Sequence, residues 1–351
     1  MAPVTERRQL FLDRSVGETR GVVMLRGRPE RLLVERDGDP GGARLGAAYA
    51  ARLRRADAKL GMGFLDLGDG PDAVLPLTAL KGVAEGATLE VEITAEARAD
   101  KGPAVALVGP AEGPAPRLLR EPPSLAERLQ AFSPRSSITR GPDAREAADL
   151  AEGQALATVH PLPEGGTLSV EATRGLVACD IDVGARTGSD AKRVGRAVNL
   201  AALVELARLL RLKSLAGLIV VDLAGRGHDA EALIRAAREA FHPDNPGVQI
   251  GGVSRLGLME IAKPWRERPL RERLLGPDGR PSAATMALRL ARALEREGRV
   301  HGGARLEARA APEVVAAFDP LRAGLIERLG ARFTLEPDPA FARDRLELAA
   351  R

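Results

Sequence analysis

Cysteine and aromatic residues are scarce in this chain of 351 residues. The one cysteine, Cys179, excludes an internal disulfide framework and any CxxC zinc site, so no zinc is expected. Aromatic residues make up 3% of the chain, with one tryptophan and one tyrosine. The core must therefore be built mainly from Ala, Leu and Val, and the cysteine usage fits a reducing compartment.

A long apolar run is also absent. The longest, Leu215 to Leu223, is too short and too rich in Gly and Ala to span a bilayer, and the first residues form no apolar signal core. We therefore expect a soluble cytoplasmic protein with no membrane partner. The length and the 44% hydrophobic content are those of a globular protein with two or three domains.

Lysine is rare too, because only six of the 52 basic residues are Lys, which leaves 46 Arg. Arginine suits bidentate contacts with phosphate, but a GC-rich coding bias produces the same excess, and we rank the bias first. Because 48 acidic residues oppose these cations, the formal charge is only +4. The charge balance therefore indicates a polyanionic partner only weakly.

Short apolar stretches separated by turn residues dominate the first third of the chain. Residues 21–36 predict two strands joined by a turn. From about 44 to 109, five further short strands between Gly-, Asp- and Pro-rich turns predict a small closed barrel such as an OB fold. We therefore divide this part into a strand segment, residues 1–38, and a barrel domain, residues 39–110.

The pattern changes after the barrel. Pro- and Arg-rich residues 111–165 predict a linker with one or two helices, whose arginines either contact nucleic acid or, as we favour, lie on a solvated surface. Alternating strands and helices then predict an α/β domain over 166–270 and a smaller α/β subdomain over 271–351. In the first, 215–223 is expected to be a strand covered on both faces and 256–265 a helix. The expected fold class is α+β with several domains.

Three aspartates lie near the ends of two predicted strands. Strand alternation puts Asp180 and Asp182 on one face, about 7 Å apart. Cys179 and Ile181 point the other way. Asp222 follows four apolar residues, so we expect it at the carboxyl end of its strand, where open α/β sheets place ligands. If the strands are neighbours, three carboxylates converge, which favours Mg²⁺ or Mn²⁺ and metal-assisted phosphodiester hydrolysis.

The spacing alone also allows simpler interpretations. Asp180 and Asp182 can be turn or cap residues, and Asp222 can form an Asx turn at a strand end. His228 and Asp229 suggest an acid/base pair, but adjacent loop residues seldom face each other, so we favour surface placement. The Gly-rich stretches lack the Lys and Ser/Thr of a phosphate-binding loop.

The longer sequence around these aspartates resembles a known family. EATRGLVACDID at 171–182, VNLAALVELARLLRLKSLAGLIVVDL at 198–223 and VSRLGLMEIAKPW at 253–265 are similar, in that order, to the catalytic domain of the RNase E/G family. The resemblance implies a fold like that of DNase I, in which Asp180 and Asp222 hold Mg²⁺ or Mn²⁺. It also implies a single-strand-specific endoribonuclease that acts in RNA processing or decay.

Other positions match the same motifs. Asp182 stands where the family usually has an Asn that helps orient the attacking water or the phosphate, so the match implies a catalytic role with an added charge and a lost amide donor. Asn199 matches the Asn before the helix, and Ser254 matches the Ser of the final motif. Matching basic residues are implied to contact RNA: Arg211, Lys213 and Arg255.

The barrel region is similar to the RNA-binding OB domain of the family over 61–80 and 96–107. This match implies that Phe64 is a ring platform for bases near the cut and that Arg98 and Lys101 contact phosphates. Without the family, a place for Phe64 in the barrel core is an equal alternative.

The chain also departs from the family. Val74 replaces a second ring platform, which predicts weaker binding of the bases downstream of the cut. Residues 111–165 are too short for the family's five-prime sensor and RNase H-like portion, of which 1–38 would be a remnant. GPDGRPS at 276–282 replaces the zinc-linking CPxC motif. The sequence therefore allows a homodimer, but not one linked by zinc. An RNA-binding protein without catalysis is the alternative function.

Overall fold

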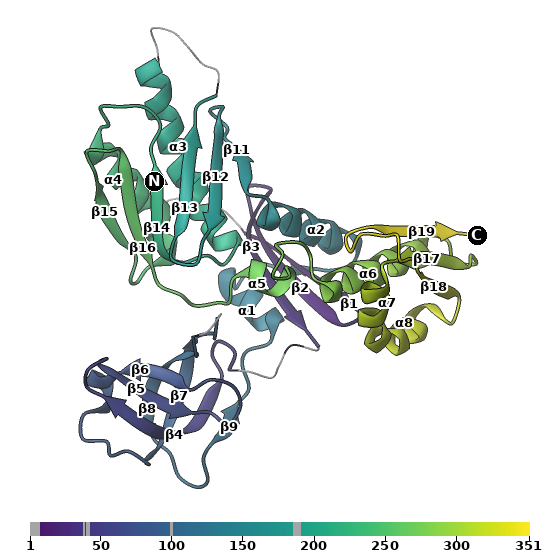
Figure 1. The fold of residues 1–351 in the computed structure, drawn as a ribbon, viewed down its shortest axis with the longest axis horizontal. Coiled ribbons are helices and arrows are strands. Elements are labelled where there is room, and N and C mark those ends of the chain that lie inside the picture. Colours follow the sequence, from purple (N-terminus) through teal and green to yellow (C-terminus); the bar gives the residue numbers. More distant parts are fainter. Residues whose placement is uncertain (1–7, 38, 40–42, 99–100, 185–190) are drawn as a thin grey trace.

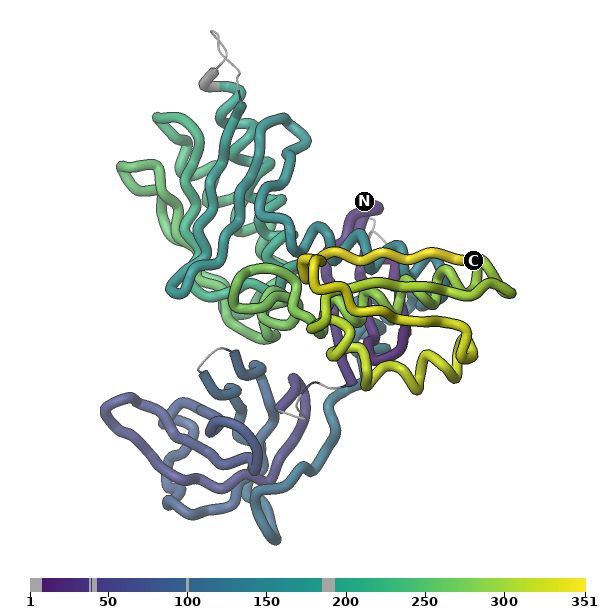
Figure 2. Tube along the Cα trace, turned by 45° about the vertical axis from the view of Figure 1, so that its right-hand side comes forward, coloured from purple at the N-terminus to yellow at the C-terminus, as the bar shows by residue number. Residues whose placement is uncertain are grey.

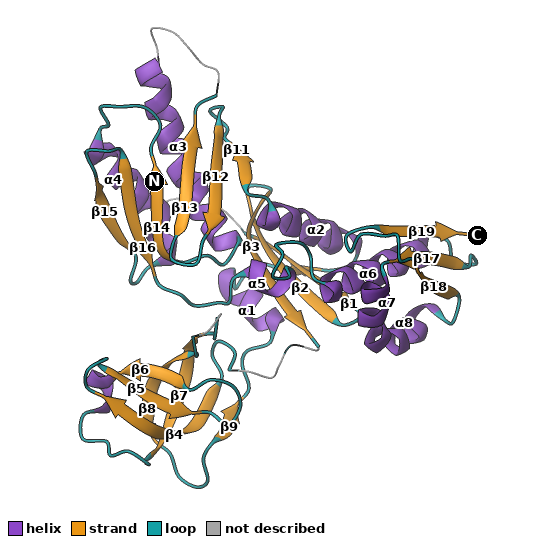
Figure 3. Cartoon of the chain, in the orientation of Figure 1, coloured by secondary structure: helices purple, strands orange, loops and turns teal. Residues whose placement is uncertain are grey.

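Helices and strands are mixed throughout the computed structural model, which describes residues 8–37, 39, 43–98, 101–184 and 191–351. In these residues the strands form four separate sheets (Figures 1 and 3). The arrangement confirms the expected α+β fold class. None of the described helices is both long and apolar enough to cross a membrane.

The N-terminal sheet has three antiparallel strands and a short fourth strand parallel to the first. On one face, Leu129 of helix α1 joins Leu10 and Leu12 in a buried cluster. On the other face, Ala148 of helix α2 packs with Leu32 in the largest core of the molecule. The elements are β1 (Gln9–Ser15), β2 (Glu18–Leu25), β3 (Arg28–Arg36), β10 (Ile138–Thr139), α1 (Leu125–Phe132) and α2 (Pro142–Leu156).

Strand β1 was not predicted from the sequence, which indicated strands only at 21–36. Its alternation is obscured because Asp13 is buried although it is charged, with 4% of its surface exposed. Arg20 neutralises Asp13 across the strand pair at 2.6 Å. Residues 111–165, predicted as a linker with one or two helices, supply α1, β10 and α2 and so cover this sheet.

The second sheet closes into a barrel. The strand order is β5-β6-β8-β7-β4-β9, and β4 also pairs with β5, which joins the two sides of the sheet. Alternate residues such as Leu53, Leu65 and Val91 fill the interior and are fully buried. The elements are β4 (Ala48–Asp57), β5 (Met62–Asp66), β6 (Ala73–Pro76), the 3₁₀ turn η1 (Leu77–Leu80), β7 (Thr88–Ala95), β8 (Ala104–Pro110) and β9 (Arg117–Arg120).

The barrel protrudes from the rest of the chain (Figure 2) and is attached through Glu96, which follows β7. This buried carboxylate accepts hydrogen bonds from the backbone N–H of Arg268 at 3.1 Å and from the Arg273 guanidinium at 2.9 Å. The backbone N–H of Glu96 donates to the carbonyl of Arg266 at 2.8 Å. The position of the barrel is therefore set by the segment that follows the third sheet.

The third sheet has six strands in the order β11-β12-β13-β14-β16-β15. β13 and β14 are parallel, and the other neighbours are antiparallel. Helices α3 and α4 cover one face, where Cys179, Ile181 and Val221 are buried. The elements are β11 (Val159–Pro161), β12 (Thr167–Ala172), β13 (Val177–Asp182), α3 (Ala191–Leu212), β14 (Gly217–Asp222), α4 (Ala230–Phe241), the 3₁₀ turn η2 (His242–Asp244), β15 (Gln249–Val253) and β16 (Leu258–Lys263).

Two predictions about this sheet were wrong. β14 was expected to be covered on both faces, but Leu218 is 45% exposed and only the side chains that alternate with it are buried. Residues 256–265 were expected to form a helix, but 258–263 form β16, with Met259 and Ile261 buried at a period of two. Both errors have one cause. Helices α3 and α4 cover only one face of this sheet, and a strand with one covered face buries side chains only at alternate positions.

The C-terminal subdomain is a three-stranded sheet, β18-β17-β19, packed with helices. Its core includes Phe318 and Phe333, whose rings meet edge to face with their centroids 6.2 Å apart. A 3₁₀ turn separates two short helices within residues 312–329. The elements are α5 (Leu270–Leu274), α6 (Ala283–Val300), β17 (Leu306–Ala310), α7 (Pro312–Phe318), the 3₁₀ turn η3 (Asp319–Leu321), α8 (Arg322–Leu329), β18 (Phe333–Pro337) and β19 (Leu346–Ala350).

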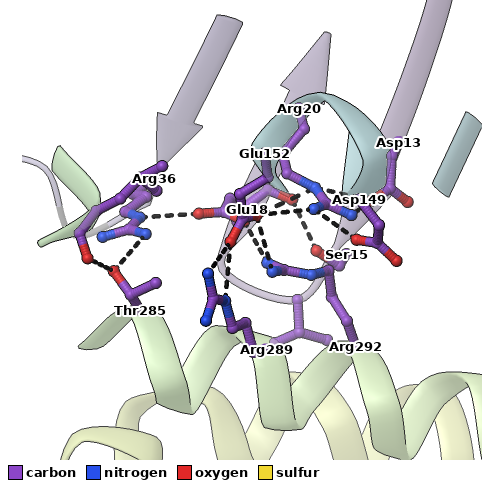
Figure 4. Close-up of polar contacts among 12 residues, drawn as sticks. Asp13, Ser15, Glu18, Arg20, Arg36, Asp149, Glu152, Thr285, Arg289 and Arg292 are labelled. Carbon is purple, nitrogen blue, oxygen red and sulfur yellow. Dashed lines mark hydrogen bonds and ion pairs between the residues drawn. The ribbon is translucent and has the colours of Figure 1, made fainter. Parts of the chain in front are cut away.

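A buried ion network lies between the N-terminal sheet and this subdomain (Figure 4). At its centre is Arg20 of β2, with 1% of its surface exposed. Its guanidinium is paired with Asp13 at 2.6 Å, Asp149 at 2.8 Å and Glu152 at 3.0 Å. Three carboxylates therefore depend on this one cation for a large part of their neutralisation.

Helix α6 supplies two further cations of the network. Arg292 pairs with Glu18 and, at 3.3 Å, with Glu152, and Arg289 pairs with Glu152 at 2.7 Å. Burial alone would raise the pKa of the Glu152 carboxyl, but the charges of Arg292, Arg289 and Arg20 outweigh burial, so its pKa lies below the ordinary value. The network joins α2, β2 and α6 through charge rather than through apolar contact.

Candidate active site

The pairing of β13 with β14 determines where two of the predicted aspartates lie. The strands are parallel and side by side at the centre of the sheet (Figure 1), and Asp180 is the register partner of Asp222. Paired residues on neighbouring strands are about 4.8 Å apart along the hydrogen-bonding direction and point to the same face. Both side chains are exposed on the face that α3 and α4 leave open. The two carboxylates are therefore neighbours at the carboxyl ends of the strands.

Asp182 lies on the same face as Asp180, two residues further along β13, and it is exposed. Its Oδ1 accepts a hydrogen bond from the backbone N–H of Gly184 at 2.8 Å, so this carboxylate closes a turn at the end of the strand. The turn role left open by the sequence therefore applies to Asp182. Within the described chain, the carboxylates of Asp180 and Asp222 form no hydrogen bond or ion pair.

The expected convergence of three carboxylates is not found. Among the described residues, no group of three or more His, Cys, Asp or Glu side chains is arranged to hold a metal ion. The in-register pair still fits a hard divalent cation, because Mg²⁺ is often held by one or two carboxylates, with water and substrate phosphate as its other ligands. The pair is open to solvent and meets no cationic side chain of the described chain that would neutralise it.

Asn199 of α3 holds the loop that follows Asp222. Its side-chain amide donates to the carbonyl of Ala224 at 3.0 Å and accepts from the N–H of Ala224 at 3.0 Å. The side chain is 2% exposed, so both bonds are shielded from water. Asn199 is therefore a positioning residue, since it fixes the backbone two residues after Asp222 without facing the open sheet.

Replacement of Asn199 with Ala should destabilise this loop. Both hydrogen bonds are lost and two partly buried backbone groups of Ala224 are left without these partners, which costs about 1–3 kcal/mol of unfolding free energy. Urea unfolding measures this loss. The matched control is Gln249→Ala, which removes an exposed amide from β15 of the same sheet. An equal change in the two variants would contradict the role given to Asn199.

The turn between β15 and β16 lies beside the carboxylate pair. Asp222 is the register partner of Leu258, and the N–H of Leu223 donates to the carbonyl of Gly257 at 3.1 Å. The Ser254 hydroxyl accepts the backbone N–H of Leu258 at 3.2 Å and so shapes the turn. Arg255 is exposed in this turn, three residues before Leu258, the register partner of Asp222.

Arg211 and Lys213, the other two basic residues at the predicted site, are buried and lie elsewhere. The Arg211 guanidinium pairs with Asp244 at 2.7 Å and Glu30 at 3.3 Å. The Lys213 ammonium donates to the carbonyl of Ala155 at 2.8 Å, at the end of α2. Burial, with smaller contributions from nearby arginines, lowers the pKa of Lys213 to about 8. Both side chains hold parts of the fold together, so we exclude them from the RNA path.

The barrel presents Phe64 on its outer surface. Leu65 points inward and is fully buried, whereas the Phe64 ring is half-buried and carries the Arg55 guanidinium 4.4 Å from its centroid. Phe64 is therefore not a barrel core residue. Val74, on the neighbouring strand, is its direct register partner, so the position of the expected second platform adjoins the first.

Arg98 and Lys101 face the third sheet rather than Phe64. They pair with each other in the hairpin between β7 and β8, and both border a cavity against the amino ends of β13 and β14. The Arg98 guanidinium lies 4.4 Å from the centroid of the Trp265 ring. The barrel thus contacts the sheet at the opposite end from Asp180 and Asp222. This separation was not predicted from the sequence.

His228 and Asp229 do not form an acid/base pair. Asp229 is the N-cap of α4, where its carboxylate accepts from the N–H of Ala232 at 3.1 Å, and it pairs with Arg196 at 2.9 Å. This arrangement serves the helix terminus.

Comparison with known proteins places the site in a family context. Residues 143–266 match the model of the Ribonuclease E/G family. Ribonuclease E of Haemophilus influenzae is 38% identical over 106 residues, 29% of this chain and 11% of that protein. Ribonuclease E of Escherichia coli is 37% identical over 105 residues, which cover 29% and 10%. A chloroplastic Ribonuclease E/G-like protein of Arabidopsis thaliana is 34% identical over 114 residues, which cover 31% and 11%. The matched segment thus spans about a tenth of these relatives.

Proposed function

Through residues 143–266 this chain belongs to the Ribonuclease E/G family, and on that premise we propose that it is an endoribonuclease that cuts single-stranded RNA with a divalent metal, Mg²⁺ or Mn²⁺, held by Asp180 and Asp222. One observation carries the proposal: the two carboxylates are register partners on parallel strands, exposed on one face. Like charges directly opposite each other in a sheet are destabilising, so a structure that keeps such a pair fits a cation site.

The residues around the pair suit phosphodiester hydrolysis. A divalent metal supplies Lewis-acid polarisation of a phosphoryl oxygen and a bound water of lowered pKa. Asp180 and Asp222 would hold it and Arg255 would contact a phosphate, while Asn199 keeps the backbone after Asp222 in place. Asp182 is engaged by Gly184 through one oxygen, and its second oxygen remains to orient a water or to accept a proton.

RNA binding is assigned to the barrel, which we propose to be an OB fold. Phe64 is an outward ring beside a cation, the arrangement on which unpaired bases stack. Bases in a duplex are already stacked and do not expose their faces to such a ring, which supports single-strand specificity.

A cleavage time course tests the function. Purified protein is incubated with an unstructured A/U-rich RNA in Mg²⁺, with and without EDTA, and the products are resolved on a sequencing gel. Internal cuts that appear in Mg²⁺ and stop in EDTA are expected. RNA that stays intact in Mg²⁺ while it binds in a salt-dependent way would instead establish the alternative, an RNA-binding protein without catalysis.

The pairing of Phe64 with Val74 predicts that one substitution weakens RNA binding and another strengthens it. Phe64→Ala should weaken RNA binding by about 1–3 kcal/mol, the contribution of one stacked base. Val74→Phe should strengthen it, because a second ring would stand directly opposite the first. Fluorescence anisotropy with a labelled oligonucleotide in EDTA measures both changes. Val108→Phe, at an exposed barrel position, is the matched control, and the same gain there would count against a defined stacking site.

A further inference from the structure

A cavity of about 700 Å³ lies between the barrel and the amino ends of β13 and β14. The hairpin residues Arg98 and Lys101 form one side, and the turn between β12 and β13, which contains Arg174, forms another. Trp265 and Leu218 complete much of the lining. This volume is within the range of small-molecule sites, roughly 300–1,000 Å³.

The charge of the lining is strongly positive. Among the described residues that line the cavity, four side chains are cationic and one, Glu272, is acidic. In the part of the chain that the structure describes, the Lys101 ammonium and the Arg174 guanidinium form no hydrogen bond or ion pair, and both residues are exposed. Two uncommitted cations at the rim of a basic cavity can bind a phosphate without breaking any contact of the protein.

The same cavity offers a surface for a base. The Arg98 guanidinium is stacked on Trp265, and the ring is half-buried beside Gly217. A planar guanidinium supported by an aromatic ring is a platform on which unpaired bases stack. Phosphate-binding cations and a stacking platform together match one nucleotide.

The cavity lies on the same strand face as the acidic pair. Leu218 borders the cavity, and Leu218 and Asp222 are on one face of β14 because they are four residues apart. At ~3.3 Å per residue, this separation is about 13 Å along the strand. An extended polynucleotide can therefore reach from the cavity to the carboxylates across the open sheet.

We propose that this cavity holds one nucleotide of a single-stranded RNA, as an anchor remote from the cut, with Arg174 and Lys101 on the phosphate and Arg98 stacked on the base. The inference rests on the proposed function, because it takes RNA as the ligand. It also accounts for where binding free energy arises, since the carboxylates of the open face repel phosphates and the positive groups lie at the other end of the sheet.

The lone tryptophan of the chain makes the proposal testable without catalysis. Trp265 emission is followed in EDTA during titration with a short oligouridylate, with uridine monophosphate titrated separately. We expect a saturable change in emission with the oligouridylate and much weaker binding of the mononucleotide. Arg174→Ala should raise the Kd and reduce the slope of log K against log salt by about 0.7, the contribution of one phosphate contact to a single strand.

Arg235→Ala is the control, since it removes the same charge from an exposed position on α4, across the sheet. Four outcomes contradict the anchor: emission that stays constant while anisotropy shows binding, equal effects of the two Arg variants, a salt slope that Arg174→Ala leaves unchanged, or equal affinity for the mononucleotide. These outcomes are separate from the nuclease proposal. A chain that cuts RNA without the emission change loses only the anchor, and one that shows the change but never cuts keeps the anchor and loses the nuclease.

Discussion

Asp222→Asn is expected to lower the rate of RNA cleavage roughly 10³-fold, because metal-ion stabilisation of the transition state is worth several kcal/mol. Asp180→Asn should have a similar effect, since both carboxylates are needed to hold one ion. Binding measured in EDTA should not be weakened in either variant, because neither side chain contacts RNA directly in the proposed mode and the loss of one acidic charge reduces repulsion of phosphate. Cleavage is measured as an initial rate at saturating RNA in Mg²⁺.

The same two variants give a readout that does not depend on activity. Removal of one of two opposed like charges should stabilise the metal-free protein by about 0.2–1 kcal/mol. Mg²⁺ should raise the melting temperature of the unaltered protein and fail to do so for the variants, since a ligand that binds only the folded state stabilises it.

Glu260→Gln is the matched control for this pair. It neutralises an exposed carboxylate of β16 that lies on the same open face of the sheet as Asp222. The register partner of Glu260 is Val220 rather than an acid. Its cleavage rate and its Mg²⁺-dependent melting should match those of the unaltered protein. If both Asp variants cut at the normal rate, the metal site assigned here is refuted.

Arg20→Met should cause the largest loss of stability, about 3–5 kcal/mol, because removal of the central cation leaves the buried carboxylates around it only partly compensated. Asp13, Asp149 and Glu152 would then face one another with less neutralisation. Urea unfolding measures the loss. The control is Arg54→Met in the barrel, where the arginine is 56% exposed and pairs with Asp66 and Asp72 on the surface. An exposed pair of this kind contributes little to stability, so equal losses would contradict the role of the network.

The network also predicts a direction for pH. The pKa of Glu152 in the folded protein lies below its ordinary value, of about 4.3 in an unfolded chain. Its stabilising contribution is therefore complete above that value and is lost as the pH falls through the folded pKa. The unaltered protein should lose stability below about pH 4, and Arg20→Met should lose less over the same interval because less pairing remains to be lost.

How much the sequence could predict depended on whether the pattern was local. The alternation of Cys179 and Ile181 with Asp180 was local, so the shared face of Asp180 and Asp182 could be predicted. The register between the two strands was not a local pattern. Nothing in the sequence places Asp180 opposite Asp222 rather than one position away, and only the pairing of β13 with β14 decides it.

The errors arose where burial and polarity disagree. β1 carries the buried Asp13, whose partner Arg20 lies on the next strand, so its apolar pattern was broken by an ion pair invisible in the sequence. Arg211 and Lys213 were expected at the RNA because they are basic. The structure buries both side chains. Arg211 pairs with Glu30, 181 positions away in the chain, and Lys213 donates to the carbonyl of Gln154, 59 positions away.

The parallel register of β13 and β14 also limits how this chain can change in evolution. Side chains of a strand alternate between faces, so one residue inserted or deleted between Gly217 and Asp222 would turn the carboxylate toward α3 and α4. Substitutions within this segment preserve the spacing of the two acids, whereas single-residue length changes destroy it. The number of residues between Gly217 and Asp222 can therefore change only by an even number if the carboxylate is to stay on the open face.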